Sequence, residues 1–388
     1  MKFTRLEWLL LFGTIGFYIL FFTFNVPVDF KTCKLCDGKQ YLKLYWFFES
    51  GTTSQITYPF YTRPLIPLLA SLVPGKNPFF AFHFINALFI LFGVISIHRL
   101  WKYLKIPDHL QWVGFVWLLL HWTGIIRYNL FDFITTDVPV YFIQALALTL
   151  FFRKKFGWFY LITPLAILQK ESFIGVMVML IIIHFWEHKA LWFRNGQHLV
   201  YALFIGLSLQ YLIVHVILPS QNHQWHPVLT LTLTTKMTLE DPTRVIRWFA
   251  AFGGAYGVIP FIIFFRFKKT KMSIEYKALL LLSLMYCGFG ILAGEDMTRI
   301  LFLGFPFIFT LSLFLFQEHK KWLLLTAILL SLVSLRINEL VIKPGWAVDY
   351  RELNYVYFWA IYYASAVALF FLAFKFETVW LKTLQKKM

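Results

Sequence analysis

The chain is dominated by long apolar stretches that recur along nearly its whole length. Each holds roughly 15–20 residues between short polar turns, close to the number that an α-helix needs to cross the hydrocarbon of a bilayer. The 388 residues are 59% hydrophobic and only 14% charged, with a mean hydropathy of +0.67. A soluble domain of this size would carry far more charge. The sequence therefore predicts an all-α, polytopic helical membrane protein.

The polar turns divide the chain into about 12 expected transmembrane helices, with a range of about 10–13. No Pro/Gly/Ser-rich or low-complexity linker interrupts the pattern, so residues 1–388 are expected to form a single integral membrane domain. The segment 156–186 could form a hairpin of two short helices or one broken span, and the charges of later turns favour the hairpin. The expected spans are 8–24, 79–98, 109–126, 138–152, 156–168, 172–186, 198–218, 246–265, 277–293, 300–316, 322–336 and 355–374.

The basic residues predict the orientation of these spans. Lys and Arg are densest in short turns and in the C-terminal tail, which the positive-inside rule assigns to the cytoplasm. Both termini are then cytoplasmic, as in a protein of the bacterial inner membrane, and the first apolar segment is an uncleaved span without a small-residue cleavage site. The net charge of +17 suits lipid headgroups, and we expect no nucleic acid partner. The inner basic residues include Arg99, Lys102, Lys105, Arg153, Lys154, Lys155, Arg266, Lys268, Lys269, Lys271, Lys320, Lys321, Lys375, Lys382, Lys386 and Lys387.

The carboxylates have the opposite distribution. Of 19 Asp and Glu residues, six fall at the inner side and the other 13 at the outer side, in turns beside helix ends. Ionisable groups are costly at that depth unless they are paired or hydrated, so several on one side suggest a shared polar chamber. The longest outer loop, 25–78, mixes aromatic and apolar residues with prolines, a composition typical of interfacial helices. Two smaller outer loops are expected at 219–245 and 337–354.

Two outer turns contain aspartates that could act in catalysis. Asp37, in CDGKQYL after the first span, could be a general base at the lipid boundary, although a solvated loop aspartate would look the same. In RYNLFDFITTD, Arg127 precedes Asp132 and Asp137. We expect Asp137 to cap the next helix, since Val-Pro follows it, and therefore regard Asp132 as the functional candidate.

The other candidates lie in three further outer segments. Lys170 and Glu171, in QKES, either neutralise each other at a helix end or face the chamber. Asp296 and Arg299, in GEDMTR, lie three residues apart and share one helical face, and Arg299 suits a phosphate through its planar fork of donors. Arg63, among aromatics and prolines, could bind a lipid phosphate or simply extend toward headgroups.

Metal and disulfide chemistry have little support in the sequence. Cys33 and Cys36 have no second Cys or His pair at zinc-site spacing, and on an oxidising face they could form a small disulfide. His223 and His226 fit a surface loop better than a metal site, and Cys287 fits packing within a span.

Taken in order, these segments resemble the C-type (GT-C) superfamily of polytopic membrane glycosyltransferases, which use polyprenyl-phosphate-linked sugars. The resemblance covers residues 1–310 and rests on DGKQYL, RPLIPLL (63–69), NPFFAFHFIN (77–86), RYNLFDFITTD, the Lys-Glu turn and DMTR before Phe-Pro. Many members carry paired acidic residues in the first outer loop, whereas here Asp37 has only Asp29 and Glu49 at a distance.

The resemblance implies a GT-C-like fold and an inverting single displacement at the outer face. Arg299 would meet the donor phosphate, with Arg63, Arg127 or Lys170 helping, and Asp37 would deprotonate a glycan, lipid or protein acceptor. Asp132, Glu171 or Asp296 would line the substrate site, and Asp132 or Asp296 could hold Mg²⁺ or Mn²⁺ through oxygen ligands.

Two other classes of function remain open from the sequence. A transporter or flippase of lipid-linked substrates would place ionisable residues near mid-span on broken helices, whereas here they cluster at outer helix ends. A non-catalytic GT-C-like subunit of a cell-envelope complex would tolerate the loss of Asp37 and Arg299.

Overall fold

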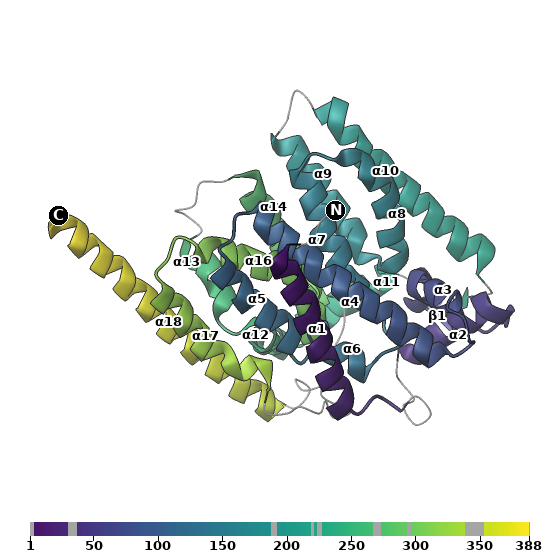
Figure 1. The fold of residues 1–388 in the computed structure, drawn as a ribbon, viewed down its shortest axis with the longest axis horizontal. Coiled ribbons are helices and arrows are strands. Elements are labelled where there is room, and N and C mark those ends of the chain that lie inside the picture. Colours follow the sequence, from purple (N-terminus) through teal and green to yellow (C-terminus); the bar gives the residue numbers. More distant parts are fainter. Residues whose placement is uncertain are drawn as a thin grey trace.

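The computed structural model describes residues 4–29, 37–187, 192–218, 221–222, 227–266, 273–292, 296–337 and 353–387 (Figure 1). It confirms an all-α architecture. The α-helices are α1 (Arg5–Phe24), α2 (Gly38–Ser50), α3 (Leu65–Ser71), α4 (Pro78–Tyr103), α5 (Asp108–Leu120), α6 (Arg127–Phe131), α7 (Val138–Phe152), α8 (Phe159–Gln169), α9 (Ser172–Glu187), α10 (Trp192–Leu212), α11 (Pro227–Glu240), α12 (Thr243–Tyr256), α13 (Ile262–Arg266), α14 (Ile274–Leu292), α15 (Met297–Phe302), α16 (Phe305–Phe316), α17 (Lys321–Ser331) and α18 (Leu353–Lys387).

Polar residues at the helix starts explain where the first long helices begin. The Thr4 hydroxyl accepts a hydrogen bond from the Glu7 N–H and the Glu7 carboxylate accepts one from the Thr4 N–H, which forms a capping box for α1. Asn77 caps α4 through Phe80 N–H, and Pro78 occupies the first helical position, where its missing donor costs nothing.

Five helices of the described residues are long and apolar enough to cross a membrane. They lie within α1, α4, α10 with its continuation to Ile217, α14 and α18. Their outward faces are strongly apolar: Phe12, Phe204 and Ile361 each expose about two thirds of their surface. Such a surface is stable against lipid and unfavourable in water, so the chain is a membrane protein.

The other expected spans contain shorter or broken helices. Over 246–265 a straight span was expected, but α12 and the segment Ile259–Arg266 meet at a bend of 104°. Gly257 at the bend has φ +63°, and a Cβ there would lie 2.1 Å from Cβ of Ser331. The close approach of Ser331 and the positive φ both require glycine. The expected spans 109–126 and 300–316 also differ, since α5 stops at Leu120 and α15 gives way to α16.

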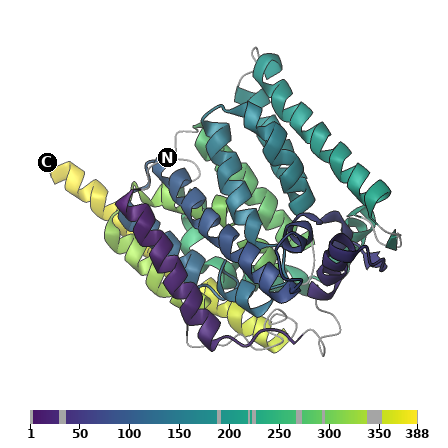
Figure 2. The same ribbon diagram turned by 45° about the vertical axis from the view of Figure 1, so that its right-hand side comes forward.

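The described residues 37–78 of the predicted first outer loop form a compact cap at one end of the long helices. Leu44 and Tyr45 of α2 and Ile66 of α3 share a buried apolar cluster with Phe82 of α4. Two residues of the loop, Ile56–Thr57 (β1), pair in parallel with Gln221–Asn222 (β2). In Figure 2 both termini lie on the left of the molecule and this cap lies on the right, together with the start of α4.

Candidate functional site

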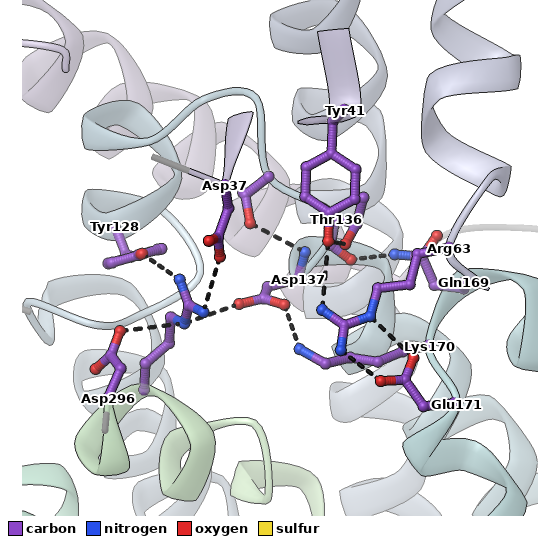
Figure 3. Close-up of polar contacts among 12 residues, drawn as sticks. Asp37, Tyr41, Arg63, Tyr128, Thr136, Asp137, Gln169, Lys170, Glu171 and Asp296 are labelled. Carbon is purple, nitrogen blue, oxygen red and sulfur yellow. Dashed lines mark hydrogen bonds and ion pairs between the residues drawn. The ribbon is translucent and has the colours of Figure 1, made fainter. Parts of the chain in front are cut away.

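Five separate segments contribute charged side chains to one cluster beneath the cap (Figure 3). They are the start of α2, the segment before α3, the α6–α7 turn, the α8–α9 turn and the start of α15. The sequence predicted that outer turns would converge in this way, and the structure brings together all of the predicted site residues except Arg127. The members are Asp37, Arg63, Asp132, Asp137, Lys170, Glu171, Asp296 and Arg299.

Arg299 holds the acidic residues of three segments together. Its Nη2 lies 3.4 Å from Oδ2 of Asp37, and its Nε lies 3.4 Å from Asp137 Oδ2 and 3.3 Å from Asp296 Oδ2. Its Nη1 donates to the Tyr128 hydroxyl, and its Cζ lies 5.2 Å from the centre of that ring. Asp296 and Arg299 share a face, as their spacing predicted. Burial acts against the charge, but the surrounding oxygens outweigh it and raise the Arg299 pKa.

Asp137 is an ion-pair partner, so its prediction as a helix cap is wrong. It occupies the N-cap position of α7, but its side chain makes no capping hydrogen bond. Its backbone already has helical angles (φ −80°, ψ −32°), and Pro139 removes one of the N–H donors that a cap would satisfy. Instead Oδ1 accepts from Lys170 Nζ at 2.5 Å, and Oδ2 faces Arg299. Burial acts to raise the pKa of Asp137, but these two cations hold it below its usual range.

Arg63 forms a bidentate pair with Glu171. Its Nε donates to Oε2 at 2.9 Å and its Nη2 to Oε1 at 2.5 Å, while Nη1 donates to the Tyr41 hydroxyl at 3.3 Å. Mutual neutralisation of Lys170 and Glu171 was one prediction for the QKES turn, but each instead pairs with a residue from another segment. The Arg63 side chain is 12% exposed and faces Glu171, so it does not extend toward headgroups as the alternative prediction required.

Two aspartates of the cluster have raised pKa values. Asp132, at the end of α6, is buried, and its Oδ1 accepts no hydrogen bond within the described residues. Burial, together with the charge of Asp37, raises the pKa of Asp132 to about 7. Burial also raises the pKa of Asp296 to about 6, although Arg299 opposes the shift. Both carboxyls are therefore protonated far more easily than ordinary aspartates.

Arg127, the remaining predicted site residue, does not join the cluster. Hydrogen bonds of its guanidinium go to backbone carbonyls. Its Nη1 donates to the carbonyls of Leu120 and Leu335, at 3.0 and 2.9 Å, and its Nη2 donates to that of Arg336. Leu120 and Leu335 are each the last residue of a helical segment, where carbonyls lack partners within the helix. Arg127 therefore joins two helix ends and supports the turn that carries Asp132.

A cavity of about 590 Å³ opens beside the cluster. Its lining combines charged, aromatic and apolar side chains. The charged ones are Asp37, Arg63, Lys170, Glu171 and Arg299, the aromatic ones include Tyr58, Phe60 and Tyr286, and the apolar ones include Leu231, Phe289, Leu292, Ile300 and Leu303. The cavity thus suits an amphipathic ligand with an anionic head and a hydrocarbon tail.

Sequence reasoning missed the uncharged polar residues of the site. Tyr41 follows Asp37 by one turn of α2 and accepts hydrogen bonds from Arg63 and from Thr136 Oγ1 at 3.0 Å. Gln169 donates to the carbonyl of Thr136 and so joins the α8–α9 turn to the α6–α7 turn. Neither residue type is unusual in such a chain, so the only available signal was the position of Tyr41 one turn after Asp37.

The part of the chain that the structure describes contains no group of three His, Cys, Asp or Glu residues arranged to hold a metal ion. The predicted alternative of Mg²⁺ or Mn²⁺ on Asp132 or Asp296 has no such group to support it there. Cys33, Cys36, His223 and His226 lie outside the described residues. Cys287 is a free thiol that packs against the core, as predicted.

Comparisons of the chain with protein-family models, with curated proteins and with solved structures gave no match. The fold and the site define a helical membrane protein with an amphipathic, charged cavity under a cap.

Proposed function

We propose that the chain is a GT-C-type membrane glycosyltransferase that moves a sugar from a polyprenyl-phosphate donor to an acceptor. The observation that carries the proposal is the mixed lining of the cavity, in which Asp37 and three cations occur together with apolar residues of α11, α14 and α15. The phosphate of the donor would meet the cations, and the first isoprene units would lie along these apolar residues. The proposed reaction assigns no role to a divalent cation.

Asp37 is the proposed general base. Its side chain is 36% exposed and lines the cavity, so an acceptor hydroxyl can reach it, whereas Asp132 and Asp296 are not among the residues that line the cavity. The acceptor oxygen would bond to the anomeric carbon while the bond from that carbon to the phosphate oxygen breaks. The acceptor proton passes to Asp37 and the electron pair leaves with the polyprenyl phosphate, which inverts the anomeric centre. Preorganised cations would stabilise the charge that develops on the phosphate.

The proposal includes the predicted topology of about 12 spans with both termini in the cytoplasm of a bacterial cell. The cap and the cavity then face the outer side, where lipid-linked sugars and glycan, lipid or protein acceptors of the envelope would meet. Partner subunits of a cell-envelope complex fit the same arrangement. The five long helices and the shorter apolar ones between them provide enough segments for this topology.

The alternative of a transporter or flippase has one feature in its favour, the broken pair α12–α13. Transporters use such breaks to place ionisable groups near mid-span. Here the break contains Gly257 and Val258, whereas the charged cluster lies at helix ends that are predicted to be on the outer side. The third reading, a non-catalytic subunit of an envelope complex, predicts that Asp37 and Arg299 are dispensable.

Transfer assays in proteoliposomes test the proposal. We expect wild-type protein to move labelled sugar from a polyprenyl-phosphate donor, and Asp37→Asn to lose about 100-fold or more of that rate, the contribution of a general base. Glu49→Gln is the matched control, because Glu49 lies on the same helix and pairs with the exposed Lys76. Retained turnover in Asp37→Asn would remove Asp37 as the base. Donor movement across the bilayer without sugar transfer would favour transport.

A further inference from the structure

Lys170 and Arg299 are held as a pair by one buried carboxylate. Asp137 gives one oxygen to Lys170 and the other to Arg299. Both cations are among the described residues that line the cavity, whereas Asp137 is not, and its side chain is only 9% exposed. Asp137 thus lies behind the pair. It offsets the repulsion between two neighbouring cations and leaves their front open to the cavity.

The two cations keep donors for a ligand. A lysine ammonium has three N–H donors, and the hydrogen bond shown for Lys170 uses one of them. Arg299 directs Nη2 toward Asp37 at 3.4 Å, longer than an ideal charge-assisted bond, so this group can turn to a stronger acceptor. An anion in front of the pair would therefore lie close to Asp37.

Arg63 lies in a different electrostatic environment. Its partner Glu171 lines the cavity beside it, so an anion approaching Arg63 meets a carboxylate at the same place. Both oxygens of Glu171 are occupied by the guanidinium, and Thr62 Oγ1 also donates to Oε2 at 3.3 Å. The charge of Arg63 is thus largely cancelled at the cavity surface, and its orientation is fixed from two sides.

Arg63 is connected to the helix that bears Asp37. Its Nη1 donates to the hydroxyl of the buried Tyr41, which also accepts from Thr136, the neighbour of Asp137. Glu171, Arg63, Tyr41 and Thr136 form one continuous chain of hydrogen bonds across four segments (Figure 3). A change at Arg63 would move the start of α2 relative to Lys170 and Arg299.

We propose that Lys170 and Arg299, paired by Asp137, form a phosphate subsite, and that Arg63 is a positioning residue acting through Glu171 and Tyr41. The inference rests on the proposed function and divides its three cavity cations into two roles. The ligand class is a phosphate ester with an apolar tail. Free inorganic phosphate offers the same head chemistry, and the experiment separates the two.

Binding assays with substituted variants test these two roles without requiring catalysis. The probe is geranylgeranyl phosphate, with geranylgeraniol and inorganic phosphate as parallel ligands, measured on the full chain in detergent. Lys170→Gln should weaken geranylgeranyl phosphate binding about 10-fold, the loss of one charge-assisted contact, and leave geranylgeraniol binding unchanged. Weak binding of inorganic phosphate alone, with no gain from the tail, would overturn the ester as ligand.

The ion pairs Arg63–Glu171 and Lys170–Asp137 should respond differently when the two partners of each pair are exchanged. Arg63→Glu and Glu171→Arg should each weaken binding, and the double variant should return it to within about 3-fold of wild type, since a swapped pair keeps its geometry. In the matched control, Lys170→Asp with Asp137→Lys, binding should not return, because a carboxylate would then face the phosphate. Recovery in both swaps, or in neither although both variants are folded, overturns the proposal.

A third variant covers failure of a swapped protein to fold, which size-exclusion chromatography would show. Tyr41→Phe removes only the hydroxyl that Arg63 and Thr136 share. It should lower the transfer rate about 10-fold and keep geranylgeranyl phosphate affinity within about 2-fold, since it displaces Asp37 and leaves the subsite intact. Weakened phosphate binding would show that the hydrogen-bonded series from Glu171 to Thr136 acts on the anion directly. If the wild-type protein binds the phosphate ester but transfers no sugar, the proposed function is overturned and the phosphate subsite is supported.

Discussion

Burial is the main cause of the raised pKa of Asp132. In the unfolded chain it would ionise near pH 3.8, whereas in the folded protein its pKa is about 7. A raised carboxyl pKa contributes stability that is fully present below pH 3.8 and is lost as the pH rises through about 7. Asp296 acts in the same direction with a pKa of about 6. The lowered pKa of Asp137 changes stability only at more acidic pH.

We therefore expect the contribution of these two aspartates to the apparent melting temperature in detergent to fall between pH 5 and pH 8. Asp132→Asn removes the titration and should flatten this dependence, with its largest stabilising effect at pH 8. Differential scanning fluorimetry across the pH range measures both. Glu49→Gln serves as control, since Glu49 pairs with a lysine that is 80% exposed. An unchanged slope in Asp132→Asn would show that this carboxyl is already compensated in the folded protein.

Arg299 should not tolerate replacement by lysine. A lysine keeps the charge but has no planar fork, so it cannot face Asp37, Asp137 and Tyr128 at once. We expect Arg299→Lys to reduce sugar transfer about 100-fold, comparable to the loss of a preorganised donor in other active sites. Initial rates against donor concentration measure it. Arg247→Lys is the control, because Arg247 of α12 pairs with Asp241 and is not among the residues that line the cavity. A variant with at least half of the wild-type rate would show that charge alone is enough.

At the scale of single elements, the break between α12 and α13 depends on one residue. Gly257→Ala places a Cβ on a backbone with φ +63° and within 2.1 Å of Ser331. We expect a loss of about 2 kcal/mol or more, seen as a lower melting temperature. Gly288→Ala is the control, because nothing lies within 4 Å of its added Cβ and it lies inside α14. That variant should be neutral or more stable. Equal melting temperatures for the two would mean that Ser331 moves aside freely.

The sequence predicted the positions of the helices better than their shapes. Hydropathy locates α1, α4 and α14 because the bilayer fixes how many apolar residues a span requires. It did not predict the bend at Gly257, which depends on how closely Ser331 approaches from a distant segment. Tertiary contacts of this kind leave no local signal.

The same limit applies to the site. The spacing of Asp296 and Arg299 identified their pairing, since residues three apart share a helical face. Asp137 was predicted as a cap from its neighbours in sequence, but the partners that decide its role, Lys170 and Arg299, come from other turns. Local chemistry names candidate residues, and only the fold determines their partners.

At the scale of the whole molecule, orientation in the membrane can be measured directly. In a background with Cys33, Cys36 and Cys287 replaced by serine, Thr53→Cys and Lys155→Cys place single thiols at exposed positions on opposite sides of the predicted topology. A membrane-impermeant maleimide should label the first in intact cells and the second only after permeabilisation. The reverse pattern would invert the topology and place the cavity on the cytoplasmic side.

The excess of carboxylates in the cluster, five against three cations, has a consequence for the proposed reaction. A sugar-bearing phosphodiester would arrive with one negative charge, whereas the phosphate monoester left behind would carry close to two. Each added negative charge raises the repulsion from carboxylates that remain in place, while the three cations are already partly neutralised. Under the proposed function, the spent carrier would therefore be bound less tightly than the cations alone would bind it. A site built only from cations would hold its product, whereas the mixed cluster would favour release of the carrier back to the bilayer.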